Sequence, residues 1–198
     1  MNLKFLNQEI FFTTCDYAQS SNLEISAASR QLHRLFKKHL IEKVTRGIWA
    51  NINHPYYNPL GAVPHLLGKE HGYVSFLTAL NQHGVISQIP ARLQIATTGH
   101  TRELVCSIGH FEFIHINPSM TNKGIEWAGS KSNYLIACAE KALLDTLYIS
   151  TRKGKRFSSL PEIDLEELDM KYLKRLLKDN IKSKIIKTSI QKYLESRK

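Results

Sequence analysis

Hydrophobic and polar positions follow a helical period from residue 26 to about residue 38. Apolar and aromatic side chains recur there at spacings of three and four, which predicts an amphipathic helix. The expected inner face comprises Ala28, Leu32, Leu35, Phe36 and His39. The expected outer face, small at its start and basic beyond it, comprises Ala27, Arg30, Gln31, Arg34, Lys37 and Lys38. Ser26 is a favourable N-cap residue, so we expect the helix to begin there.

Two short alternating runs follow this helix and flank a turn at Arg46-Gly47. They predict a hairpin that carries Lys43 and Arg46, with Trp49 two residues beyond the turn. Upstream, residues 4–20 are expected to form two short helices, the second capped by Thr13 or Thr14. The stripe expected on the first comprises Leu3, Leu6, Ile10 and Phe11. Helix, short helix, turn, basic helix and hairpin is the order of a winged helix-turn-helix.

The rest of the chain mixes strand and helix patterns. Residues 51–64 are rich in Asn, Pro, Tyr and Gly and predict a packed connector. Beyond it, strands are expected at 93–98, 103–108, 111–116, 125–127 and 133–136, and helices at 74–82 and 137–150. Residues 165–198 predict two or three basic helices. Their apolar stripes comprise Leu168, Tyr172, Leu173, Leu176 and Leu177, then Ile181, Ile185, Ile186, Ile190 and Leu194.

The expected fold class is therefore α+β, with two domains. Residues 1–54 are predicted to form a winged helix-turn-helix that binds DNA. Residues 55–198 are predicted to form a mixed α/β domain that ends in basic helices. A chain of 198 residues is long enough for this division.

Charge changes this picture by indicating a polyanionic partner. Lys and Arg number 27 against 17 Asp and Glu, a formal net charge of +10. Residues 1–54 carry a net +3, residues 55–149 none, and residues 150–198 a net +7. Residues 171–198 alone hold 10 basic and 2 acidic side chains. That segment is either a solvated polar face or a second electrostatic surface for nucleic acid or an acidic protein, and its sequence does not separate the two.

Other candidate chemistry is sparse in the sequence. Three cysteines at distant positions in apolar contexts indicate buried thiols in a reducing cytoplasm rather than disulfides or a zinc site. His100, His110 and His115 match no ligand spacing, so we expect surface or hydrogen-bonded histidines and no metal or cofactor. A signal peptide and an apolar run of about 18 residues are both missing from the pattern, so no membrane association is expected.

An enzyme is not expected either. The sequence lacks a phosphate-binding loop, a dinucleotide-binding glycine motif, a nucleophile elbow and a paired-histidine zinc motif. Glu140 and Asp145 flank Lys141 in a predicted helix, but their spacing puts the carboxylates on different faces. Ion pairing on the helix surface is the expected role, with a buried structural bond from Glu140 as the alternative.

The predicted DNA contacts follow from residue type. Arg30, Gln31 and Arg34 suit base edges in the major groove, and Lys37 and Lys38 suit phosphates. The full predicted set is Ser26, Ala27, Arg30, Gln31, Arg34, Lys37, Lys38, Lys43 and Arg46. In it, Ser26 and Ala27 allow close approach, and Lys43 and Arg46 contact phosphate or the minor groove. The alternative is an ordinary surface helix with a solvated basic face.

The chain resembles the AbiEi-type antitoxins of type IV toxin–antitoxin systems and the regulators related to them. Residues 25–50 carry the first likeness, ISAASRQLHRLFKKHLIEKVTRGIWA, and residues 72–86 the second, GYVSFLTALNQHGVI. The third runs through LQIATTGHTRELVCSIGHFEFIHI and YLIACAEKALLDTLY, at residues 93–116 and 134–148. The chain departs from the family at His39, where many relatives have Gly.

The resemblance implies two activities. The first is autorepression through repeats in the protein's own promoter, read in double-stranded DNA by Ala27, Arg30, Gln31 and Arg34 with Arg46 on the wing. The second is counteraction of a cognate nucleotidyltransferase-like toxin, as in phage defence. One alternative is a winged-helix regulator whose C-terminal domain senses a ligand or partner and which has no toxin. A nucleic-acid-processing enzyme is a third reading, disfavoured by the missing motifs.

Overall fold

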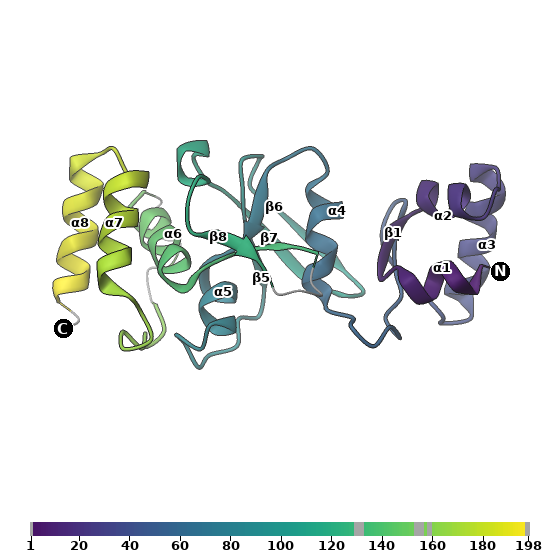
Figure 1. Cartoon of the computed structure of the whole chain (residues 1–198), viewed down its shortest axis with the longest axis horizontal. Coiled ribbons are helices and arrows are strands. Elements are labelled where there is room, and N and C mark those ends of the chain that lie inside the picture. The colour runs from purple at the N-terminus through teal and green to yellow at the C-terminus, as the bar shows by residue number, and fades with distance from the viewer. Residues whose placement is uncertain (1, 129–132, 153–156, 158–159, 197–198) are drawn as a thin grey trace.

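A computed structural model describes residues 2–128, 133–152, 157 and 160–196, and its architecture is mixed α+β (Figure 1). The elements follow one another along the long axis roughly in chain order, from three N-terminal helices through a central sheet to two C-terminal helices. The expected α+β class is therefore confirmed.

The N-terminal unit combines three helices with a three-stranded antiparallel sheet of order β1-β3-β2. Its elements are α1 (Leu3–Gln8), β1 (Phe11–Thr13), α2 (Thr14–Ser20), α3 (Ile25–Lys37), β2 (Glu42–Thr45) and β3 (Ile48–Ala50). The hairpin β2–β3 was expected, but β1 was not. Phe11 pairs with Ala50 in that strand instead of extending a helical stripe. A strand sends Phe11 and Phe12 to opposite faces, and each enters a different hydrophobic cluster.

Helix α2 begins with a complete capping box, which settles its cap at Thr13. The Thr13 hydroxyl accepts from the backbone N–H of Asp16 at 3.1 Å, and the Asp16 carboxylate accepts from the N–H of Thr13 at 2.8 Å. Cys15 lies in the first turn and is exposed, so the expectation that all three thiols are buried is wrong. Tyr17 and Ala18, on the other face of α2, are buried instead.

Helix α3 begins one residue before the predicted start. Glu24 occupies the N-cap position and makes no side-chain cap bond, and Ser26 lies inside the first turn, so the expectation of a Ser26 cap is wrong. The reason is that the preceding turn already closes at Leu23, whose N–H donates to the carbonyl of Ala18 at 2.9 Å. The helical backbone follows as soon as that turn is complete.

Helix α3 ends in a Schellman motif at His39. The N–H of His39 donates to the carbonyl of Phe36 at 2.9 Å, and the N–H of Leu40 donates to that of Leu35 at 3.1 Å. His39 has φ 55°, the left-handed conformation that glycine adopts without strain. The side chain of His39 is exposed, so its predicted place on the inner face is wrong. Its backbone explains why glycine suits this position.

The N-terminal unit has its own hydrophobic cluster between the helices and the sheet. It comprises Leu6, Phe12, Tyr17, Ala18, Ala28, Leu32, Leu35, Ile41 and Trp49. The burial of Ala28, Leu32 and Leu35 was predicted from the helical period, and Phe36 is half-buried. These residues fix which face of α3 is left outside.

The larger sheet has six strands in the order β6-β7-β5-β4-β9-β8. Its strands are β4 (Gly72–Val74), β5 (Leu93–Thr97), β6 (Arg102–Cys106), β7 (Gly109–His115), β8 (Ile125–Trp127) and β9 (Leu135–Ala137). The pairs β5–β7 and β4–β9 are parallel and the others antiparallel. The predicted helix at 74–82 is partly wrong, because Val74 belongs to β4 and the helix begins only at Phe76. Tyr73 and Val74 are both buried, as suits a central strand.

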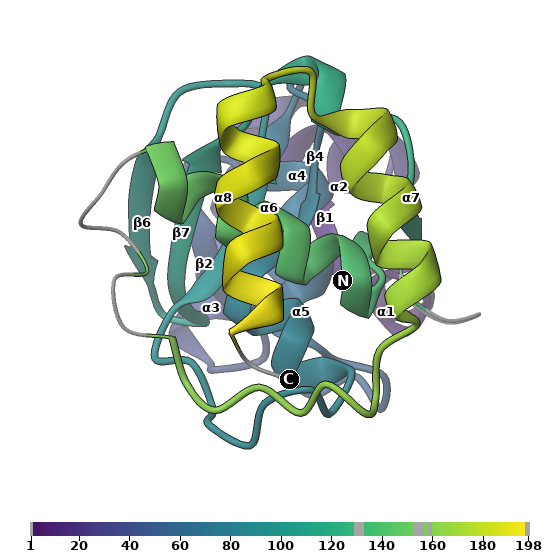
Figure 2. The ribbon, with the colours of Figure 1, turned by 90° about the vertical axis from the view of Figure 1, so that its left-hand side faces the viewer.

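Helices cover this sheet in layers. The elements outside the strands are η1 (Pro59–Ala62), α4 (Val63–Leu67), α5 (Phe76–Gln82), η2 (Pro118–Met120), α6 (Ala139–Arg152), α7 (Met170–Asn180) and α8 (Lys184–Glu195). Figure 2 shows α7 and α8 side by side in front of α6. Every residue from Lys141 to Ile149 is buried, so α6 is enclosed by α5, the sheet and the last two helices. Ile185 is exposed, so its predicted place in an apolar stripe is wrong.

The connector packs the N-terminal unit against the rest of the molecule. The ring of Phe11 contacts those of Tyr57 and His65, with centroids at 5.8 and 6.4 Å. Burial lowers the pKa of His65.

A second contact with the N-terminal unit comes from the turn between β6 and β7. The hydroxyl of Ser107 donates to the backbone carbonyl of Lys43 at 3.2 Å. The boundary between residues 54 and 55 stays a prediction.

A buried polar cluster joins α6 to β4. The ammonium group of Lys141 pairs with the carboxylate of Asp145, and neither side chain is exposed to solvent. Lys141 also donates to the Tyr73 hydroxyl at 2.7 Å, and Tyr73 donates to Asp145 at 2.9 Å. Ser75 donates to the same carboxylate at 2.8 Å. The expected surface ion pairing at Asp145 is therefore wrong, because Asp145 faces the end of β4, where Tyr73 and Ser75 donate to its carboxylate. Glu140 lies outside the cluster and accepts from the N–H of Asp169 at 2.9 Å.

Burial sets the protonation preferences in this cluster. It raises the pKa of Asp145, and the ammonium group of Lys141 opposes that shift. It lowers the pKa of Lys141, which the carboxylate of Asp145 opposes. Burial and the neighbouring carboxylate raise the pKa of Tyr73 well above its ordinary value, so the phenol keeps its proton and remains a donor.

The substitution Asp145→Asn is expected to destabilise the protein by about 3–5 kcal/mol, because it leaves a buried ammonium group without its counter-charge. Chemical denaturation measures this loss. The matched control is Asp179→Asn, the same change in the exposed pair of Asp179 with Lys123 at 2.8 Å, which should leave stability nearly unchanged. Equal effects of the two substitutions contradict a special role for the buried pair.

The substitution His39→Gly is expected to stabilise the protein by about 0.5–1 kcal/mol, because glycine adopts the left-handed conformation without a Cβ penalty. A thermal melt should show the transition rise by about 2 °C. Lys38→Gly serves as the control and should destabilise, since Lys38 has φ −92°. A lower melting temperature for His39→Gly argues against the helix end described above.

Candidate nucleic-acid interface

The outer face of α3 is exposed and basic. Arg30, Arg34 and Lys37 are all exposed, and they lie opposite the buried positions Ala28 and Leu32. Lys38, at the C-cap, is also exposed, whereas Ala27 is half-buried. The basic positions predicted along α3 therefore share one accessible side of the helix. Long, flexible cationic side chains placed in this way reach both base edges and phosphates.

Gln31 is less available for contacts with DNA bases than its residue type indicates. It is half-buried, and its side-chain oxygen accepts from the Tyr17 hydroxyl at 3.0 Å. Bidentate recognition of adenine uses both the oxygen and the nitrogen of an amide. In this arrangement the oxygen of Gln31 is already engaged, and its amide nitrogen is the group left to donate to a base. The bond to Tyr17 also ties α3 to α2 at the level of the predicted contact surface.

The hairpin β2–β3 presents the second group of cations. Lys43 and Arg46 are exposed, and Arg46 leads into the turn, where Gly47 has φ 78°. The carbonyl of Gly47 accepts from the N–H of Thr14 at 2.9 Å, which holds the turn against the start of α2. The tip of the hairpin is therefore fixed to the helices.

Trp49 anchors the hairpin to α2 and α3. Its side chain is 2% exposed, and its indole N–H donates to the Thr14 hydroxyl at 3.0 Å. The ring of His33 packs edge-on against Trp49 at 5.5 Å, and Phe36 does so at 6.4 Å. A rigid hairpin beside a helix keeps two sets of cations at a constant separation, which suits a ligand with regularly spaced charges.

His33 is a residue that the sequence pattern did not select. It is exposed on α3 and contacts the hairpin through Trp49, so it lies where the two basic elements meet. Only its position along the helix could have indicated that His33 belongs to this surface. Residue 33 falls one turn beyond Arg30 and one turn before Lys37, on the outer face.

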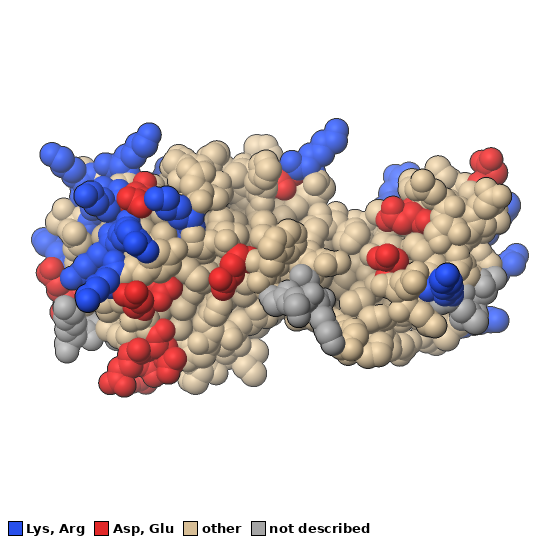
Figure 3. Space-filling view, in the orientation of Figure 1, with Lys and Arg blue, Asp and Glu red and all other residues tan. Residues whose placement is uncertain are grey.

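The cations of this surface have no carboxylate partners among the residues that the structure describes. Ion pairs there involve Arg92, Arg102, His110, Lys123 and Lys141, all of them beyond the N-terminal unit. Without a carboxylate nearby in the described residues, the positive field of these cations is left for an external anion. Figure 3 shows separate Lys and Arg side chains on the N-terminal unit and a denser group at the opposite end.

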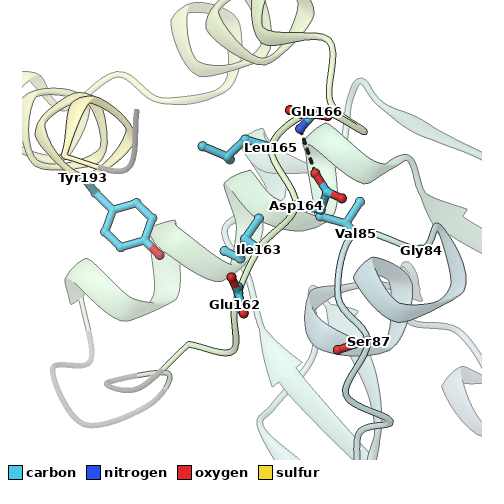
Figure 4. A pocket seen from close by; sticks show the side chains of 9 residues that line it. All are labelled: Gly84, Val85, Ser87, Glu162, Ile163, Asp164, Leu165, Glu166 and Tyr193. Atoms are coloured by element: carbon cyan, nitrogen blue, oxygen red, sulfur yellow. Dashed lines mark hydrogen bonds between the residues drawn. The ribbon is translucent and has the colours of Figure 1, made fainter.

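One hollow in the rest of the molecule suits an anionic ligand poorly, because its lining is acidic. A hollow of about 660 Å³ lies between the loop after α5, the loop before α7 and α8 (Figure 4). Its acidic lining comprises Glu162, Asp164 and Glu166, and Asp164 accepts from the N–H of Glu166 at 3.0 Å. A smaller hollow of about 210 Å³ lies at the junction with the N-terminal unit, between Phe11, His54, His65 and Tyr134.

Groups with catalytic or metal-binding potential are already engaged or separated. Burial raises the pKa of the Cys138 thiol to about 12, which keeps it protonated. His110 bonds to Glu103 at 3.0 Å, and His115 to the carbonyl of Gly99 at 2.8 Å. Within the described ranges, no three His, Cys, Asp or Glu side chains are grouped to hold a metal ion.

Comparison with models of known protein families and with curated proteins finds no match to this chain. Of the helices in the described part of the chain, none is both long and apolar enough to cross a membrane.

The bond between Thr14 and Trp49 is expected to stabilise the N-terminal unit. Thr14→Val leaves the buried indole N–H without its acceptor and should cost about 1–3 kcal/mol. A double-mutant cycle with Trp49→Phe, followed by urea unfolding, should give a coupling energy of about 1 kcal/mol. Strictly additive effects mean that the bond does not hold the hairpin in place.

Proposed function

We propose that the protein is a DNA-binding transcriptional regulator whose N-terminal unit acts as a winged helix-turn-helix. The observation that carries this proposal is the shared exposure of Arg30, Arg34 and Lys37 on α3 beside Lys43 and Arg46 on a fixed hairpin. A helix of this length fits the major groove, and an adjacent hairpin reaches the flanking backbone or minor groove.

In this proposal the residues divide into two kinds of contact. Arg30 and Arg34 read base edges, with the amide nitrogen of Gln31 as a further donor, and Ser26 and Ala27 allow the helix to approach closely. Lys37, Lys38, Lys43 and Arg46 neutralise phosphates. The first group confers sequence preference, while the second sets affinity and its dependence on salt.

We further propose that the protein represses its own operon and acts as the antitoxin of a type IV toxin–antitoxin system. Support comes from the resemblance of residues 25–50, 72–86, 93–116 and 134–148 to AbiEi-type antitoxins. The partners are then the repeats of its own promoter and a nucleotidyltransferase-like toxin. Co-expression with a nucleotidyltransferase-like protein from the adjacent gene tests the second partner, and unrelieved growth arrest contradicts the antitoxin role.

A regulator that senses a ligand and has no toxin is the second candidate. The hollow at the junction favours it, because Phe11 of the N-terminal unit and Tyr134 of the sheet domain both line it. A ligand bound there contacts both units at once. If growth arrest is never observed and a small molecule alters DNA affinity, this candidate replaces the antitoxin.

The double substitution Arg30→Ala/Arg34→Ala is expected to weaken binding to the upstream region of the gene by about 1–3 kcal/mol for each lost base contact. A gel shift at fixed salt measures the loss. The control is Lys69→Ala, an exposed cation outside the N-terminal unit, which should bind as the wild type does. Unchanged binding by the double variant rules out α3 as the reading helix.

The substitution Arg46→Ala is expected to act differently, because Arg46 contacts phosphate in this proposal. Binding should weaken to a similar degree for specific and unrelated duplexes, and the slope of log affinity against log salt should fall by about 1. A loss confined to the specific duplex assigns Arg46 to base reading instead.

A further inference from the structure

The last two helices form a single basic surface, here called the α7–α8 surface. It consists of Lys171, Lys174, Arg175, Lys178, Lys182, Lys184, Lys187 and Lys192. All are exposed except Lys187, which is half-buried. Only Asp179 and Glu195 are acidic within these two helices and the turn between them. Figure 3 shows this concentration of Lys and Arg at the end of the molecule farthest from α3.

The arrangement of these cations follows from how α7 packs. Leu173, Leu176 and Leu177 are buried toward α6, which turns the remaining positions outward. The outward cations on α7 are Lys171, Lys174, Arg175 and Lys178, spaced three and four residues apart. Seven residues of helix rise by about 10 Å. Phosphates of one DNA strand advance by about 3.4 Å each, so this row spans about three of them.

The cations of the α7–α8 surface form no ion pairs with carboxylates among the residues that the structure describes. Asp179 pairs with Lys123, which lies in the loop between η2 and β8, at 2.8 Å, and not with a cation of α7 or α8. Across the described part of the chain, no ion pair involves a cation of the α7–α8 surface. Arg175 instead lies over the ring of Tyr172, at 4.9 Å from its centroid.

The composition of the surface distinguishes a nucleic acid from an acidic protein. Specific protein interfaces have an apolar core, often aromatic, inside a polar rim. The only large apolar side chain that is strongly exposed on α7 or α8, within the described residues, is Ile185. A surface that serves solubility alone mixes charges of both signs. Within α7 and α8 one sign dominates, and the acidic loop 162–167 borders this surface at the C-terminal half of α8, near Tyr193.

We propose that the α7–α8 surface binds the phosphate backbone of duplex DNA and that one molecule thereby joins two DNA segments. The two basic surfaces lie at opposite ends of the long axis (Figures 1 and 3), so a duplex that lies across one end does not reach the other. The joining activity rests on the proposed function of α3, whereas backbone binding by the α7–α8 surface does not.

Backbone binding is tested first in the Arg30→Ala/Arg34→Ala chain, with an unrelated duplex. Changing Lys171, Lys174, Lys178 and Lys184 together to Gln should reduce the remaining affinity at least tenfold and lower the salt slope by about 3–4. The matched control changes the same four residues to Arg, which keeps the charge and should keep the binding. Circular dichroism and the melting temperature establish that both variants are folded.

Joining is tested with an immobilised promoter duplex and a second, labelled duplex. The wild type should retain the label, whereas the Gln variant and Arg30→Ala/Arg34→Ala should each retain little of it. If the four Gln substitutions leave DNA affinity unchanged, or poly-glutamate binds this surface and duplex DNA does not, the inference is overturned. If the four Gln substitutions weaken DNA binding but Arg30→Ala/Arg34→Ala leaves promoter binding unchanged, the proposed function of α3 fails. Backbone binding by the α7–α8 surface then stands.

Discussion

The buried pair of Lys141 and Asp145 fixes how the helices pack on the six-stranded sheet. Two charges without solvent contact are tolerated only when their hydrogen bonds are satisfied. Tyr73 and Ser75 supply those bonds from the end of β4. Helix α6 is therefore held at one position along the central strand. Because α7 and α8 pack on α6, the same pair also determines where the C-terminal cations lie.

In the N-terminal unit an uncharged residue, Trp49, has the equivalent role. Trp49 fills the space between the hairpin and α3, and its bond to Thr14 brings in the start of α2. The left-handed backbone at His39 then turns the chain from α3 into the hairpin. These contacts are internal, so Arg30 and Arg34 need no role in folding and remain exposed for an external partner.

The sequence predicted the features that depend on local periodicity. The inner face of α3, the hairpin at Gly47, the strands β5 to β9 and the two basic helices all follow from patterns over a few residues. The missed features depend on distant partners. Strand β1 exists because Phe11 pairs with Ala50, and Asp145 is buried because α6 packs it against Tyr73 and Ser75 at the end of β4. The hydrogen bond from Tyr17 to Gln31 likewise joins two helices, and no local sequence pattern predicts it.

We propose that α3 lies in the major groove of DNA, and directed cleavage reports its position there. Ser26→Cys in a Cys15→Ser background, modified with iron–EDTA, places a cleaving reagent on the outer face of α3. If α3 lies in the groove, the strand cuts are confined to a short segment of the upstream region, at the bases that Arg30 and Arg34 protect. Bound DNA that is cut uniformly, or not at all, contradicts it.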